Sequence, residues 1–343
     1  MAPAPPRDPL TVAVYWDDLA RRPEQLARIA RESGTEPLIW DGVDPAPDVE
    51  VLLAADVPAI IPLQTPRLRL LQYASAGVEW LVGEPIWHSD VPLATAAGAG
   101  AVPMSEHVFM LLLALLRGAG RYAEAQRRRE WNDDPPYADE LYGRTIGLIG
   151  YGHVGHAVAH LARAFGMRVL ATSATVRERA PLVVPGVSPF IDPPANPAAG
   201  RLPDERLPLT QLDELLAAAD VLVVCAALTP RSRGLVDAQA LALMKPGSYL
   251  INVSRGRIVD EAAMIEALRE GRLVGAGLDV TADEPLPADS PLWDLPAVIL
   301  TPHVSTGDVD RYVRRVVSIL LANLDRARRG EPPLTAVDRR RGY

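Results

Sequence analysis

Three closely spaced glycines form a pattern with a specific binding chemistry. Gly150, Gly152 and Gly155 follow an apolar run, Thr145 to Ile149, and precede a segment with helical spacing, His156 to Phe165. In such a strand, turn and helix, the first glycine permits the tight turn, the second lets the backbone approach a pyrophosphate, and the third allows close helix packing. The helix N-terminus attracts phosphate. Because another apolar run follows the helix, the order of elements predicts a dinucleotide-binding site rather than a glycine turn without a ligand.

The end of that second apolar run departs from the usual dinucleotide pattern. An Asp or Glu commonly stands there and holds the ribose hydroxyls of NAD, whereas this chain has Ser173. Without the carboxylate, the 2′-phosphate of NADP is not repelled, and Arg177 or Arg179 could reach it. The alternative is that both arginines are solvated surface charges. We therefore expect the cofactor to be NAD(P), with NADP slightly favoured, and we expect Ser173 and Arg177 to contact it.

Further along the chain, three polar residues lie just after apolar runs that are typical of strands. An isolated Arg, Glu or His is most often a surface charge, but Arg255, Glu284 and His303 each occur close to the end of a predicted strand. The blocks around them resemble the three signature blocks of the D-isomer-specific 2-hydroxyacid dehydrogenases, and they span Ile251 to Glu261, Gly275 to Pro285 and Leu300 to His303. The resemblance extends over nearly the whole chain.

The resemblance implies a role for each of these polar residues. Arg255 matches the residue that binds the substrate carboxylate and orients the 2-keto oxygen, a task suited to a planar guanidinium. His303 matches the general acid in reduction and base in oxidation, as imidazole permits near neutral pH. Glu284 matches the carboxylate that holds this imidazole and favours its protonated form. Asp279 matches the residue that bonds the nicotinamide carboxamide.

Further contacts follow from the same resemblance. We expect His153, Val154, Ala226, Val253 and Ser254 to join the three glycines at the cofactor. On the first domain, the loop Ala74 to Glu79 resembles one whose backbone N–H groups bind the substrate carboxylate. The expected substrate contacts are Ala76, Gly77, Arg255 and His303. The alternative for the Ala76 loop is an ordinary turn between a strand and a helix.

The rhythm of apolar runs and helical patterns predicts how these residues are positioned. Short apolar runs alternate with polar helical segments over the first hundred residues, and the alternation restarts at Thr145, which indicates two parallel sheets. We expect an α/β protein with two Rossmann-like domains and an active site in the cleft. Residues 1–103 and 305–343 form a discontinuous, flavodoxin-like substrate domain, and residues 104–304 form a doubly wound dinucleotide-binding domain.

Three segments complete this prediction. The spacing of Val309, Val313, Val316, Leu320 and Leu324 predicts a closing helix that packs back on the first domain. A periodic segment at 104–131 predicts one helix between the domains, and in relatives this helix belongs to a dimerisation arm, so the resemblance implies a homodimer. The proline-rich segment at about 180–208 has no consistent period and is predicted to be an irregular insertion.

Composition restricts the class of protein. The formal net charge is -8 and the pI is about 5.4, which argues against a nucleic-acid footprint. A single cysteine, Cys225, permits no intrachain disulfide, so the expected location is cytoplasmic. The apolar run Val108 to Leu116 is shorter than the roughly 20 residues of a membrane-spanning helix, and no export signal is recognised. No membrane association and no metal site are predicted.

The function expected from these residues is reversible hydride transfer. The predicted substrates are NAD(P)H and a small 2-oxo acid, of the glyoxylate or hydroxypyruvate type, or the matching D-2-hydroxy acid. One alternative is a formate- or phosphite-type dehydrogenase, but formate enzymes carry Gln in place of Glu284 and Asn where Gly100 aligns. A second alternative is a non-enzymatic, dinucleotide-sensing protein on the same fold, which the three polar residues do not exclude.

Overall fold

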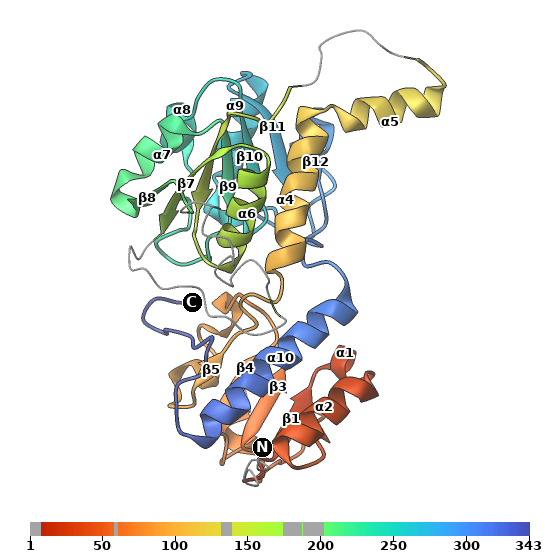
Figure 1. The fold of residues 1–343 in the computed structure, drawn as a ribbon, viewed down its shortest axis with the longest axis vertical. Helices are drawn as coiled ribbons and strands as arrows, with labels where there is room; N and C mark the ends of the chain where they lie inside the picture. Colours follow the sequence, from red (N-terminus) through yellow and green to blue (C-terminus); the bar gives the residue numbers. More distant parts are fainter. Residues whose placement is uncertain (1–7, 58–60, 132–138, 174–186, 188–201) are drawn as a thin grey trace. The chain divides into compact units, whose positions relative to one another are not determined.

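The computed structural model describes residues 8–57, 61–131, 139–173, 187 and 202–343. These residues belong to two compact units (Figure 1). Unit 1 contains the described residues up to Ala99, residue 187 and those from Gly307 onward, and unit 2 contains the remainder. Unit 1 is therefore assembled from both ends of the chain.

Unit 1 is built on a five-stranded parallel sheet. Its strands are β1 (Val12–Tyr15), β2 (Leu38–Ile39), β3 (Val51–Ala54), β4 (Leu70–Tyr73) and β5 (Leu93–Ala94). They lie in the order β2-β1-β3-β4-β5, which is the flavodoxin-like order. The two strands β3 and β4 are buried on both faces, which explains why they are continuous apolar runs rather than alternating patterns.

Helices cover both faces of this sheet. The helices α1 (Asp17–Ala20), α2 (Pro23–Ser33) and α10 (Val309–Arg328) share one core with β1, and α10 packs against α2. The other face is covered by α3 (Ile61–Gln64) and the 3-10 turns at Glu79–Leu81 and Pro85–His88. The predicted closing helix is thus confirmed, and its apolar stripe completes the core of a sheet made by the N-terminal residues.

Unit 2 is built on a seven-stranded parallel sheet in the order β12-β11-β10-β9-β6-β7-β8. The strands are β6 (Thr145–Ile149), β7 (Arg168–Ser173), β8 (Glu205–Pro208), β9 (Val221–Val224), β10 (Ser248–Asn252), β11 (Leu273–Leu278) and β12 (Val298–Leu300). In β9, Val221 and Val223 enter one core while Leu222 and Val224 enter the other. The strand order is that of a doubly wound sheet, in which the order reverses beside β6.

Two helical layers enclose the seven-stranded sheet (Figure 1). The helices α4 (Ala101–Leu116) and α6 (His153–Ala164) pack together on one face. The opposite face carries α7 (Leu212–Ala218), α8 (Ala238–Leu243) and α9 (Glu261–Arg269). Shorter 3-10 turns lie at Leu209–Gln211, Gly256–Ile258 and Pro291–Asp294. Because both faces are covered, every residue of the central strands β6, β9 and β10 is buried. Polar groups available for chemistry therefore lie in the loops after the strands.

The prediction of one continuous helix over 104–131 is wrong. Helix α4 begins earlier, at Ala101, and ends at Leu116; a separate helix, α5, spans Ala119–Arg128 at a bend of 64°. Gly118 has a φ of 65°, a left-handed conformation that breaks the helix and that glycine adopts without strain. In the described part of the chain, no single helix is long and apolar enough to cross a membrane, and α4 and α5 meet that criterion only as a bent pair.

The prediction of an irregular segment over 180–208 is also wrong at its C-terminal end. Residues Glu205–Pro208 form β8, which pairs in parallel with β7 at the edge of the sheet. The sequence Glu-Arg-Leu-Pro has weak strand propensity, so the pairing is decided by the neighbouring strand rather than by local preference. A proline is tolerated in such an edge strand. Residues 180–186 and 188–201 lie outside the described residues.

Candidate active site

The three proposed catalytic residues follow three neighbouring strands. Arg255 lies just after β10, Glu284 follows β11, and His303 follows β12. These strands are parallel and adjacent, so their carboxyl ends meet at the same edge of the sheet. In open α/β sheets this edge is where ligands bind.

Asn252, the last residue of β10, fixes the loop that carries Arg255. Its side chain is almost fully buried; Nδ2 donates to the carbonyl of Arg255 at 3.0 Å, and Oδ1 accepts from both the backbone N and the Oγ of Ser254 at 3.1 Å. The half-buried Arg255 donates from Nη1 to the carbonyl of Ser254 at 2.7 Å. A buried side-chain network of this kind holds the backbone of Arg255 in one conformation.

The loop of Arg255 is pressed against the loop of Glu284. A Cβ atom on Gly256 would lie 2.0 Å from the carbonyl of Thr281, so only glycine permits this approach. Arg257 adds two bonds, from Nε to the carbonyl of Ala282 and from Nη2 to Asp283, both at 2.9 Å. The two loops are therefore positioned as one unit.

Glu284 and His303 form a direct hydrogen bond. Nδ1 of His303 lies 2.8 Å from Oε2 of Glu284, and Oε1 of Glu284 accepts from the backbone N of Thr281 at 3.2 Å. An ionised carboxylate can only accept, so Nδ1 carries the proton of this bond and Nε2 is the ring nitrogen that can exchange a proton with a ligand. His303 has a φ of 54°, an uncommon conformation for a residue with a side chain, which the surrounding hydrogen bonds maintain.

Asp279 supplies those hydrogen bonds. Its buried carboxylate accepts from Thr301 Oγ1 at 2.7 Å, Val304 N at 2.9 Å and Ser305 N at 3.0 Å, and its carbonyl accepts from His303 N at 2.8 Å. Burial alone would raise the pKa of Asp279, but the hydrogen bonds from Ser305, Thr301 and Val304 outweigh burial and lower it. Asp279 therefore remains ionised and holds the loop of His303.

His107 extends this network from α4. Its Nε2 lies 2.9 Å from Thr301 Oγ1 and 3.5 Å from Asp279 Oδ1. The sequence pattern does not predict that His107, Thr301 or Ser305 belongs to the site. Residue type alone does not indicate membership of the site, because these residues are brought together by the packing of α4 against β12.

The glycine turn has the geometry expected for a dinucleotide. Gly150 has a φ of 101°, and a Cβ there would lie 2.7 Å from the backbone of Ala226; a Cβ on Gly155 would lie 2.4 Å from the carbonyl of Gly150. A Cβ on Gly152 would meet nothing within 4 Å, so the chain leaves space at the N-terminus of α6. The first turn of a helix offers N–H groups to an anion there. These residues fit a pyrophosphate group.

Ser173 is the last residue of β7, where a ribose-binding carboxylate commonly stands. Its Oγ accepts a hydrogen bond from Nη2 of Arg206 on β8 at 2.9 Å. The predicted contact Arg177 lies outside the described residues, as does Arg179. Arg206 was missed because its segment was predicted to be irregular, and only the pairing of β8 with β7 reveals its position.

The two predicted substrate contacts on unit 1 follow β4. Ala76 is exposed and Gly77 is half-buried. The neighbouring Ala74 is held by Tyr312, whose hydroxyl donates to its carbonyl at 2.9 Å. The backbone N–H groups of Ala76 and Gly77 donate to no other residue that the structure describes. This loop can therefore present two amides to an anion.

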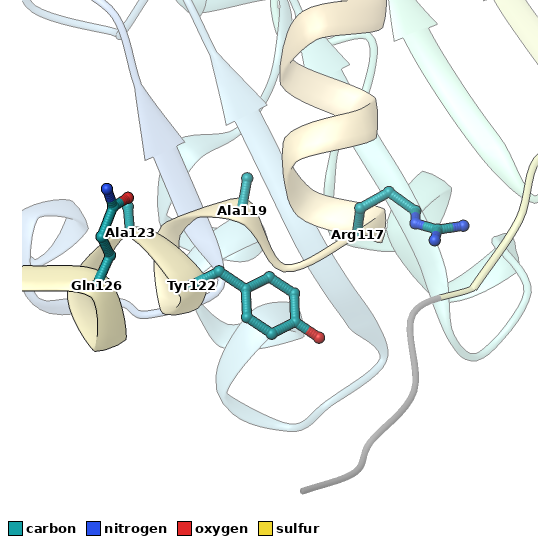
Figure 2. Close-up of a pocket in the computed structure, with 5 residues that line it drawn as sticks. All are labelled: Arg117, Ala119, Tyr122, Ala123 and Gln126. Atoms are coloured by element: carbon teal, nitrogen blue, oxygen red, sulfur yellow. The ribbon is translucent and has the colours of Figure 1, made fainter. Parts of the chain in front are cut away.

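A separate hollow lies where α4 passes into α5 (Figure 2). It is lined by Arg117 at the end of α4 and by Ala119, Tyr122, Ala123 and Gln126 of α5. None of the predicted catalytic, cofactor or substrate residues lines it. The hollow is thus not part of the candidate active site.

The doubly wound sheet and its glycine turn define unit 2 as a dinucleotide-binding α/β domain. Residues 109–305 match the family model of the D-isomer specific 2-hydroxyacid dehydrogenase, NAD binding domain. The chain belongs to this family.

Relatives cover most of the chain. The D-3-phosphoglycerate dehydrogenase of Mycobacterium tuberculosis is 34% identical over 314 residues, which are 87% of this chain and 50% of that protein. This chain thus spans about half the length of the phosphoglycerate dehydrogenases from mycobacteria that it matches. The glyoxylate reductase of Pyrococcus furiosus is 32% identical over 282 residues, 80% of this chain and 77% of the relative.

Solved structures share the fold. A D-isomer specific 2-hydroxyacid dehydrogenase from Xanthobacter autotrophicus Py2, in complex with NADPH and MES, has a TM-score of 0.80 at 28% identity and covers 98% of this chain and 100% of its own. An NADPH-dependent glyoxylate/hydroxypyruvate reductase from Sinorhizobium meliloti, in complex with NADP and sulfate, has a TM-score of 0.76 at 27% identity, with 97% and 100% covered.

Proposed function

We propose that this chain is an NAD(P)-dependent oxidoreductase that transfers hydride reversibly between the coenzyme and a small 2-oxo acid or D-2-hydroxy acid. The observation that carries the proposal is the 2.8 Å bond between His303 Nδ1 and Glu284 Oε2, at the strand ends beside Arg255. A proton donor next to a carboxylate-binding guanidinium suits a substrate that has a carbonyl beside a carboxylate. The glyoxylate and hydroxypyruvate reductases among the relatives support this substrate class.

Each residue of the site has a task in this reaction. The bound coenzyme supplies the hydride in reduction. His303 donates the proton from Nε2 to the carbonyl oxygen, while Glu284 accepts from Nδ1 and stabilises the charged imidazolium before transfer. Arg255 binds the carboxylate and orients the carbonyl oxygen. For unit 1, the proposal is that the backbone N–H groups of Ala76 and Gly77 bind a carboxylate.

The coenzyme contacts are proposed around the glycine turn. The N–H groups at the start of α6, including those of His153 and Val154, face the pyrophosphate next to Gly150, Gly152 and Gly155. Ala226 lies against that turn, and Val253 and Ser254 follow β10 toward the nicotinamide end. Asp279 Oδ2 accepts from the backbone N of Ser305 at 3.0 Å, and the same carboxylate is the proposed acceptor for the nicotinamide carboxamide.

A spectrophotometric screen tests the proposal. Small 2-oxo acids are offered with NADH and NADPH, formate and phosphite are offered with the oxidised coenzymes, and the His303→Asn variant serves as the matched control. Turnover of a 2-oxo acid that the variant loses supports the proposal. Absence of any turnover alongside micromolar dinucleotide binding would favour a dinucleotide-sensing protein instead.

We further propose a homodimer that forms through α4, α5 and their neighbours. Helix α5 projects from the body of unit 2 (Figure 1). Large apolar side chains of unit 2 are exposed on α4, on α5 and in the segments that follow α5 and α6: Met110, Tyr122, Trp131, Tyr142 and Phe165. Trp131 is 94% exposed, and aromatic side chains are enriched in the interfaces between subunits. Light scattering should give a dimer mass for the native chain and a monomer mass for a Tyr122→Glu, Trp131→Glu variant; a dimer in the variant would contradict this interface.

The cytoplasmic location and the absence of nucleic-acid and membrane partners remain predictions.

A further inference from the structure

Arg206 reaches from β8 to the residue that ends β7. Its Nη2 atom lies 2.9 Å from the Oγ of Ser173, which closes β7. In dinucleotide-binding sheets the residue at the end of this strand faces the adenosine ribose. The chain therefore has a hydroxyl in the usual position of the carboxylate and, directly bonded to it, a positive charge from the neighbouring strand.

The pairing of β8 with β7 fixes this arrangement. Asp204, which precedes β8, accepts from the backbone N of Val169 at 2.7 Å and from Nη2 of Arg163 on α6 at 2.6 Å. In the resulting register Arg206 lies opposite Ala171, and Ser173 lies opposite Pro208. Side chains of paired positions and of every second residue share one face of a sheet. Arg206 thus extends past the small side chain of Ala171 toward Ser173.

The glycine turn contributes an aromatic ring to the same place. The guanidinium of Arg206 lies 5.6 Å from the ring centroid of Tyr151, the residue between Gly150 and Gly152. Burial raises the pKa of Tyr151 to about 12, although the positive charges of Arg206 and Arg163 act in the opposite direction. The phenol is therefore neutral near pH 7, and its ring attracts the guanidinium without neutralising it. Arg206 is held between the turn that suits the pyrophosphate and the end of β7.

We propose that Arg206, together with the hydroxyl of Ser173, binds the 2′-phosphate of NADP(H) and selects this coenzyme over NAD(H). A planar guanidinium matches phosphate oxygens bidentately, and a hydroxyl donates one further bond. The inference rests on the proposed use of a nicotinamide dinucleotide. It assigns the discrimination to β8 rather than to the segment that contains Arg177.

Equilibrium binding without turnover tests this assignment. Calorimetric titration with 2′-phosphoadenosine 5′-phosphate and with 5′-AMP isolates the phosphate from the rest of the coenzyme. In Arg206→Gln, affinity for the 2′-phosphorylated ligand should fall by about 10- to 100-fold while affinity for 5′-AMP is retained, because only the first ligand loses a charge-assisted bond. Arg168→Gln is the matched control: this exposed arginine lies on the same strand pair, bonded to Glu205, but at the start of β7.

Two further measurements separate recognition from a structural role. Arg206→Lys retains the positive charge but lacks the paired N–H donors of the guanidinium, so it should lose about three- to tenfold in affinity for the 2′-phosphorylated ligand alone. This variant also tests the assignment if the Gln variant does not fold. The ³¹P resonance of the bound 2′-phosphate should titrate at lower pH than that of free ligand, whose second pKa is about 6. In Arg206→Gln it should return toward the free value.

The opposing outcomes are distinct. Unchanged affinity for the 2′-phosphorylated ligand in both Arg206 variants, or an equal loss for both ligands, would overturn the assignment while dinucleotide binding, and with it the proposed function, stands. If the native protein binds neither ligand, nor NADPH, nor NADH, the proposed function fails as well, and the coenzyme site must be rejected as a whole.

Discussion

The two halves of the seven-stranded sheet build their ligand-facing edges in different ways. After β10, β11 and β12, side chains hold one another: Asn252 fixes the loop of Arg255, and Asp279 fixes the loop of His303. After β6, the edge is made of glycine backbone, and at the end of β7 the described residues bring together the side chains of Ser173 and Arg206, which we propose to face the ribose.

The two halves differ in the hydrogen bonds that support the proposed catalytic residues and the proposed ribose-binding residues. On the catalytic side, every proposed reacting group is bonded to a second group that is itself bonded, so its geometry is defined before a ligand arrives. On the ribose side, the proposed recognition depends on which residues β7 and the edge strand β8 bring together. We therefore expect the catalytic half to respond to substitution with large losses of rate, and the ribose half with changes in selectivity.

The largest effect is expected from Arg255→Ala. Removing a guanidinium that binds the reacting molecule should lower kcat/KM for the preferred 2-oxo acid by about 10²–10⁴-fold, while the Kd for coenzyme stays within about twofold. Steady-state kinetics and calorimetry measure the two quantities. Arg269→Ala, at an exposed arginine of α9 that pairs with Glu266, should leave both unchanged. Near-native kcat/KM in Arg255→Ala would remove this residue from the mechanism.

On the ribose side, Ser173→Asp should reverse the selectivity. The introduced carboxylate would pair with Arg206, accept from the ribose hydroxyls of NADH and repel a 2′-phosphate. The ratio of kcat/KM for NADPH to that for NADH should fall by about 5- to 150-fold, which corresponds to about 1–3 kcal/mol. The rate of 2-oxo acid reduction at saturating NADH should change little. If both coenzymes lose equally, the two halves are not independent.

Asp279→Asn should lower the free energy of unfolding. An amide replaces an acceptor of three hydrogen bonds with a group that accepts through one oxygen only, at a cost of about 1–3 kcal/mol. Because the folded pKa of Asp279 is below 3.8, its stabilising contribution is present above that pH and is lost as the pH falls through the folded pKa. Urea denaturation should show the gap between native protein and variant closing below about pH 4. A gap that is constant with pH would contradict this account.

Glu284→Gln should give the smallest effect. The amide can still accept a hydrogen bond from Nδ1 of His303, but it carries no charge to stabilise the imidazolium that donates the proton. Since both side chains are partly exposed, with 42% and 37% of their surface accessible, kcat/KM for reduction of the 2-oxo acid should fall by only about two- to fivefold. Steady-state kinetics measure this loss. An unchanged kcat/KM would leave Glu284 with a structural role only.

Much of the architecture could be predicted from the sequence, because it follows from local patterns. The seven-stranded sheet's glycine turn and the polar residues after β10, β11 and β12 lie in short blocks whose order is read directly along the chain. The break at Gly118 was missed because apolar spacing continues across it, and a single left-handed residue leaves no periodic signal. Strand β5, only Leu93–Ala94, is too short for any pattern.

The missed parts of the site depend on contacts between distant residues. Arg206 reaches Ser173 only because β8 pairs with β7, and the sequence Glu205–Pro208 has no strong preference for a strand. His107 lies on a helix that reads as an apolar core helix, and its bond to Thr301 follows from how α4 packs on the sheet. Such contacts are set by packing over the whole unit, which local propensity does not contain.

The order of strands in unit 2 also has an energetic consequence. Neighbouring strands lie about 4.8 Å apart, so the three intervals from β7 to β10 separate Ser173 from the loop of Arg255 by roughly 14 Å. Substitutions more than about 10 Å apart without shared partners usually have additive free energies. In a double-mutant cycle, Ser173→Asp and Arg255→Ala should therefore show a coupling below about 0.5 kcal/mol. In a sheet of this width, natural selection or design can change the preferred coenzyme without altering the reaction carried out beside β10.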